Sequence, residues 1–115
     1  MDKEIKNKTK EFAQGILETK EYRAFLSASK ALKENEKATN LLEEFQRKQR
    51  ELQIKEDDEL MDELRRLQSE VQKDETIMTF VKSQVELINL LKKTSDTISE
   101  KIGMPFTSIA GGCCG

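Results

Sequence analysis

The sequence predicts an all-α fold, an elongated helical bundle of about four to five helices with a long C-terminal helix. Charged residues make up 37% of the 115 residues and there is a single proline, a composition typical of long helices and coiled coils. Apolar residues recur every three or four positions, as they do along one face of a helix. We expect a helical domain over residues 1–102, which dimerises, and a flexible tail rich in glycine and cysteine over residues 103–115.

Two helices are expected before Asn35. The first covers about residues 2–18, and its apolar stripe consists of Ile5, Thr9, Phe12 and Ile16. Thr19 has the right side chain to cap the second, whose stripe consists of Tyr22, Phe25, Leu26, Ser29 and Leu32. We expect this helix to end near Asn35, because asparagine tolerates the left-handed backbone conformation of a helix end. Asn35 could equally cap the helix that follows.

The middle of the chain is predicted to be helical with one interruption. A third stripe consists of Ala38, Leu41, Leu42, Phe45 and Leu52, and a fourth of Leu60, Leu64, Leu67 and Val71. Between Gln53 and Glu59 only Ile54 is apolar, and the two stripes do not share one heptad register. We expect a kink or short loop there, with Asp57 or Asp58 capping a restarted helix. A continuous bent helix is the alternative.

Asp74 is expected to cap a last, long helix, which Gly103 and Pro105 end. Mostly apolar residues follow a heptad seam in it, whose positions are Ile77, Val81, Gln84, Ile88, Leu91, Ser95, Ile98 and Ile102. Phe80, Leu87 and Leu90 widen the apolar face, and a helix with so wide a face usually packs on more than one neighbour. The residues that we assign to the core or to an oligomer interface are Ile77, Phe80, Val81, Val85, Ile88, Leu91, Ile98 and Ile102.

The composition argues against most catalytic functions. The chain has no histidine, so it lacks the commonest general base and any Ser-His or Cys-His pair, and we expect no catalytic residues. The net charge of −2 argues against direct nucleic-acid binding, although the basic stretch 47–50 keeps an RNA-associated factor as an alternative. Since we find neither a signal-peptide core nor an apolar run of about 20 residues, we expect a cytoplasmic protein without a membrane partner.

Cys113 and Cys114 are the two cysteines of the chain, and they are candidate ligands of a metal or cluster. A zinc or iron–sulfur site generally needs four soft ligands, so one chain supplies half of them. The neighbouring glycines would let both thiolates reach a shared centre, and a second tail or a partner protein would complete it. A 4Fe-4S cluster or zinc shared between chains is therefore one hypothesis. An incidental tail or a redox-sensitive thiol pair is the other.

Residues 1–104 resemble the YlbF/YmcA family of small helical regulatory proteins. The resemblance follows the order and spacing of three helix segments, which are marked by Tyr22 and Phe25, by Phe45, Gln46 and Gln49, and by Ile77 and Phe80. Relatives often carry a proline after the residue that caps the third and last helices. This chain has Asn35-Glu36 and Asp74-Glu75 instead, so it keeps the caps and loses the prolines.

The resemblance implies a non-enzymatic bacterial regulator with an all-α, commonly dimeric fold. Its expected partner is a second copy or a paralogous family member. Some members of the family join a three-protein complex that influences competence, biofilm formation and sporulation, and that acts with an endoribonuclease in mRNA processing. That complex is associated with iron–sulfur clusters, and by similarity Cys113 and Cys114 become candidate cluster ligands.

Overall fold

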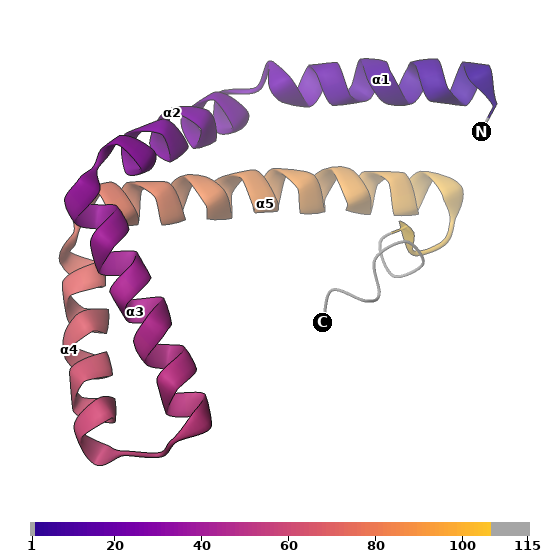
Figure 1. Ribbon diagram of the computed structural model, residues 1–115. Helices are drawn as coiled ribbons and strands as arrows, with labels where there is room; N and C mark the ends of the chain where they lie inside the picture. The colour runs from indigo at the N-terminus through magenta and orange to yellow at the C-terminus, as the bar shows by residue number, and fades with distance from the viewer. Residues whose placement is uncertain (1, 107–115) are drawn as a thin grey trace.

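The computed structural model describes residues 2–106 and contains five α-helices, with no strand within this range (Figure 1). The helices are α1 (Lys3–Leu17), α2 (Lys20–Glu34), α3 (Glu36–Ile54), α4 (Asp58–Lys73) and α5 (Glu75–Ile102). The predicted all-α fold with a long C-terminal helix is confirmed. Most of the expected tail, residues 107–115, lies outside the described residues.

The helices form two arms that meet at one junction. α3 and α4 make an antiparallel hairpin, and α2 packs along the first part of α5 (Figure 1). α1 extends away from the start of α2 and packs on little else. The extents of the molecule are 56 × 30 × 22 Å and its radius of gyration is 19.0 Å, against about 13 Å for a compact domain of this size. The fold is therefore elongated, as predicted.

Two single-residue bends form the junction. Asn35 separates α2 from α3, and its Oδ1 accepts a hydrogen bond from the backbone N–H of Ala38 at 3.0 Å. Asp74 separates α4 from α5 in the same way, and its Oδ1 accepts from the N–H of Ile77 at 2.9 Å. The Nδ2 of Asn35 also donates to the Oγ1 of Thr76 at 3.0 Å. This hydrogen bond thus connects the bend before α3 to the bend after α4.

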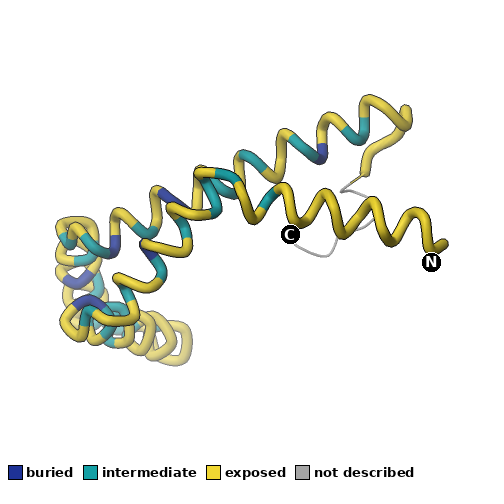
Figure 2. Tube along the Cα trace, turned by 90° about the horizontal axis from the view of Figure 1, so that it is seen from above, coloured by how far each residue is buried: buried dark blue, intermediate teal, exposed yellow. Residues whose placement is uncertain are grey.

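The buried core gathers around this junction. Among the described residues, the buried apolar ones are Ala28, Ala38, Leu67 and Ile77, and each of α2, α3, α4 and α5 supplies one of them. Next to them the rings of Phe25 and Phe80 lie 5.5 Å apart between α2 and α5. Figure 2 shows that exposure increases from this region toward α1 and toward the far end of the hairpin. The core therefore stabilises the meeting point of the arms more than the arms themselves.

The end of α2 differs from the sequence-based expectation. Asn35 has φ −95° and ψ 99°, which is an extended conformation and not the left-handed one that we expected. An N-cap residue needs an extended backbone so that its side chain can reach the N–H groups of the next helix. Asn35 therefore adopts the backbone conformation that the N-cap of α3 requires. Capping the following helix was the second of the two roles expected for it.

The predicted interruption between the third and fourth helices is confirmed. α3 ends at Ile54, and Asp57 caps α4 by accepting a hydrogen bond from the N–H of Glu59 at 3.0 Å. The alternative of one continuous bent helix is wrong, because Lys55 and Asp57 both have extended backbones. At the other end of the chain, Gly103 ends α5 in the left-handed conformation, with φ 76°, as glycine at this position commonly does.

An ion pair ties the outer part of α3 to α4. The Nζ of Lys48 lies 2.9 Å from Glu63 Oε2 and 3.9 Å from Glu51 Oε2, and the lysine side chain is 22% exposed. The hydrogen-bonded carboxylate of Glu63 raises the pKa of Lys48 above its usual value of 10.5, against the opposing effect of desolvation. Glu51 raises this pKa further. The charged form of Lys48 therefore favours the closed hairpin.

Replacement of Leu67 tests whether the junction dominates stability. Leu67 is 1% exposed, so Leu67→Ala should lower the free energy of unfolding by about 2–5 kcal/mol through lost burial and the cavity left behind. Ile54 is 89% exposed, and Ile54→Ala should change it by less than about 0.5 kcal/mol. Urea denaturation followed by circular dichroism measures both. Equal losses in the two variants would contradict the placement of the core.

The Lys48 ion pair predicts a pH-dependent contribution to stability. Because the pKa of Lys48 is raised on folding, the contribution is complete below the unfolded-state pKa of about 10.5. It is lost as the pH rises through the higher native value. Glu63→Gln should therefore be less stable than the wild type at neutral pH and equally stable at strongly alkaline pH. The difference in stability at neutral pH should be smaller in high salt, which screens the ion pair. Urea denaturation across this pH range measures the difference.

Glu43→Gln is the matched control, because Glu43 is an exposed carboxylate of α3. A loss in Glu63→Gln that is no larger than in this control argues against a role for the pair in stability. A difference that persists after Lys48 has lost its proton argues against it as well.

Candidate protein–protein interface

One side of α5 packs against α2. Ile77 is buried at its start, and Ser83 is buried one and a half turns further on, where its hydroxyl donates to the carbonyl of Phe80 at 2.8 Å. The larger apolar side chains on this side are half-buried, and they are Phe80, Leu87, Leu90 and Ile98. α2 therefore covers the residues that widen the apolar face beyond the predicted heptad seam.

A second apolar side of the same helix is left open. Its exposed fractions are 37% for Val81, 50% for Val85, 54% for Ile88 and 41% for Leu91. We call these four residues the open face of α5. They follow one another at spacings of four, three and three residues over about three turns, and so form one stripe along the helix. A contiguous exposed apolar surface of this kind usually marks a site of interaction.

α1 carries a similar unpartnered surface. Ile5 is 52% and Phe12 46% exposed, and Ile16 is half-buried. We call these three residues the α1 stripe. α1 meets the remaining helices mainly at its end, where the hydroxyl of Thr19 donates to the carbonyl of Ile16 at 2.7 Å. The α1 stripe therefore has little of its apolar surface covered by its own chain.

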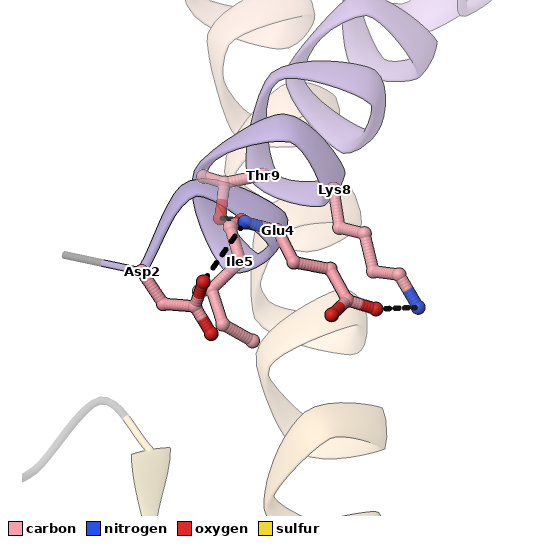
Figure 3. A network of polar contacts seen from close by, with 5 residues as sticks. All are labelled: Asp2, Glu4, Ile5, Lys8 and Thr9. Carbon is pink, nitrogen blue, oxygen red and sulfur yellow. Dashed lines mark hydrogen bonds and ion pairs between the residues drawn. The ribbon is translucent and has the colours of Figure 1, made fainter.

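The polar contacts at the start of α1 are local, as Figure 3 shows. The Oδ1 of Asp2 accepts from the N–H of Glu4 at 3.1 Å, and Lys8 Nζ lies 3.8 Å from Glu4 Oε1. The hydroxyl of Thr9 donates to the carbonyl of Ile5 at 2.7 Å. These contacts begin and support the helix without attaching it to another element.

The structure divides the residues that were assigned to the core or to an interface. Ile77 is buried, and Phe80 and Ile98 are half-buried. The rest are exposed, namely Val81, Val85, Ile88, Leu91 and Ile102. The sequence assignment did not include the α1 stripe, although the spacing of four, three and four through Ile5, Thr9, Phe12 and Ile16 was visible. What the spacing could not show was that no other helix covers it.

The other candidate sites receive less support. Within residues 2–106 no group of three or more histidine, cysteine or acidic side chains could hold a metal ion, and Cys113 and Cys114 lie outside these residues. In the basic stretch 47–50, Arg47 and Arg50 are exposed, but Lys48 is engaged by Glu63. Two of the three cations of this stretch are therefore exposed, and the third is engaged in an ion pair. No helix in the described range has the length and apolar character to cross a membrane.

Comparison with known proteins agrees with the fold. No curated protein and no solved structure matches the chain. A family model described as control of competence regulator ComK, YlbF/YmcA, matches residues 5–103. The matched range includes the open face of α5 and the whole α1 stripe, and it excludes Cys113 and Cys114. Because the match extends over most of the 115 residues, the chain belongs to the YlbF/YmcA family.

Proposed function

We propose that this protein is a non-catalytic helical adaptor that works by pairing with a second copy or with a paralogous member of its family. The family is described by control of the competence regulator ComK, which is a regulatory role. The observation that carries the proposal is the open face of α5, where four apolar side chains are exposed over three successive turns. A regulatory complex that includes an endoribonuclease, and through it mRNA processing, is the wider setting that we propose.

An energetic argument supports pairing and also limits it. Burying a large apolar side chain completely contributes about 1.5–3 kcal/mol, so a half-exposed one can still contribute about 1 kcal/mol. The open faces of two copies would together contribute roughly 8 kcal/mol. Association costs on the order of 4–15 kcal/mol. The open face of α5 is therefore large enough to take part in an interface, but it needs additional surface to make that interface stable.

A charge placed on the open face tests this proposal. Ile88→Lys should weaken self-association or pairing with a paralogue at least tenfold, because a lysine at this position would have to be desolvated in the complex. Sedimentation equilibrium over a micromolar concentration range measures the association constant. The matched control is Thr79→Lys, which adds the same charge at an exposed position on another side of α5. The control should associate as the wild type does.

The helical content of both variants, measured by circular dichroism, should equal that of the wild type, since neither residue is buried. A wild-type chain that remains monomeric at micromolar concentration and binds no paralogue would falsify the proposed function. If both lysine variants weaken association equally, the interface does not lie on the open face.

We also propose, as a second function, that Cys113 and Cys114 bind zinc or an iron–sulfur cluster shared between chains. The supporting observation is that the two cysteines are adjacent and flanked by glycine. Since one chain supplies two thiolates and such sites generally use four, the stoichiometry should be one metal centre per two chains. Cys113→Ser and Cys114→Ser should each abolish binding.

Anaerobic purification followed by metal analysis and visible absorption spectroscopy measures this. The matched control is Ser108→Ala, which alters the same tail without removing a thiol. Metal-free wild-type protein, prepared both alone and with a paralogue, argues against the second function and leaves the adaptor proposal intact.

A further inference from the structure

α1 is helical although its own chain gives it little packing support. α1 has 15 residues, and an isolated helix of this length is only marginally stable in water. Its polar contacts are local, and Ile5 and Phe12 remain about half-exposed. Helices in proteins owe most of their stability to packing of the apolar face. An apolar surface outside the described contacts would supply what α1 lacks.

The open face of α5 has the shape that the α1 stripe requires. At about 1.5 Å per residue, Ile5 to Ile16 extends over about 17 Å and Val81 to Leu91 over about 15 Å. Both surfaces also follow helical spacing, with seven and four residues between the members of the α1 stripe and four, three and three between those of the open face. Two helices with this spacing pack side by side at a crossing angle of about 20°. The two surfaces thus match in length and in periodicity.

The α1 stripe does not reach the open face of α5 within one chain. α1 precedes the bend at Glu18 and Thr19 and runs antiparallel to α5, and the two helices lie apart in Figure 1 and diverge in Figure 2. Exposure of Val85 and Ile88 at 50% and 54% agrees with this separation. A second copy of the chain brings the two surfaces together without a change in either arm.

We propose that the protein forms a reciprocal dimer in which the α1 stripe of each copy packs along the open face of α5 of the other. This inference rests on the proposed adaptor function and specifies how the pairing is made. In a two-fold dimer each contact occurs twice. One chain therefore contributes both an α1 stripe and an open face, and each of these two surfaces is covered in the dimer.

The area involved is that of a stable interface. Six exposed side chains of the two surfaces offer about 500 Å² of apolar area per copy, if a large side chain exposes about 150–200 Å², and they are Ile5, Phe12, Val81, Val85, Ile88 and Leu91. Interfaces are about 60% apolar, so the total corresponds to about 800 Å² per copy. This is the usual size of a stable interface. The open faces of α5 alone would provide much less.

Crosslinking between two different variants tests the arrangement. Both carry Cys113→Ser and Cys114→Ser, so that a single engineered thiol remains on each chain. One carries Phe12→Cys in the α1 stripe and the other Val85→Cys in the open face. After mixing and treatment with a short bismaleimide, we expect a heterodimeric product several-fold in excess of that formed by Phe12→Cys with Thr79→Cys. Thr79 lies on another side of α5 and is the matched control.

The other outcomes separate this inference from the proposed function. Preferential crosslinking of Val85→Cys with itself would place α5 against α5 and overturn the reciprocal dimer. Crosslinking within one chain that carries both thiols, without a product between chains, would also overturn it. If the sample sediments as a dimer without an excess of the Phe12–Val85 product, the reciprocal dimer is wrong and the adaptor function is unaffected. A sample that is monomeric throughout and binds no paralogue rejects both.

A second variant probes α1 without disturbing the core. Phe12→Lys should shift the sedimentation equilibrium at least tenfold toward monomer, whereas Gln14→Lys, an exposed position off the stripe, should leave it unchanged. Neither should change the midpoint of unfolding of the monomer, because α1 contributes no buried residue. An unchanged equilibrium in Phe12→Lys overturns the inference. Loss of binding to anionic lipid vesicles in that variant would then identify α1 as a membrane-facing helix.

Discussion

The hydrogen bond between Asn35 Nδ2 and Thr76 Oγ1 connects the two bends on which the fold depends. Asn35 uses both ends of its amide, because its Oδ1 at the same time accepts from the N–H of Ala38. An aspartate could supply the cap but could not donate to Thr76, whose hydroxyl would then have to be the donor. One side chain therefore ends α2, begins α3 and fixes the start of α5 beside them. The direction of both arms follows from this arrangement.

The two bends are made without the proline that relatives often place after the cap. Proline at the first helical position presets φ for the helix. Here Glu36 and Glu75 occupy that position, and their carboxylates favour the same helix starts through the positive end of the helix dipole. Asn35 and Asp74 still cap at 3.0 and 2.9 Å. Each of these two helix starts is thus stabilised by a capping side chain and a carboxylate in the first turn, without a proline.

Local chemistry explains which features could be predicted from sequence. Thr19, Asp74 and Gly103 were predicted correctly as helix boundaries, and Asp57 was one of two candidates for another, because a cap depends on a side chain and the few backbone groups next to it. Coverage of the apolar faces could not be predicted in this way. Val85 and Leu87 are both apolar residues of α5, but they lie on different sides of the helix and only Leu87 is partly covered. The difference depends on the position of α2, which is set at Asn35, far away in sequence.

The separation of core from arms has a consequence for function. The buried residues Leu67 and Ile77 stabilise the junction, whereas the α1 stripe and the open face of α5 contribute little to the fold of a single chain. Such outlying elements unfold locally at lower cost than the core, so selection can alter them for a partner without loss of the fold. α5 is the exception, because Ile77 belongs to the core and Val81, one turn later, to the open face. Assembly on the open face would therefore rigidify the helix that also anchors the junction, and this couples pairing to the stability of the whole chain.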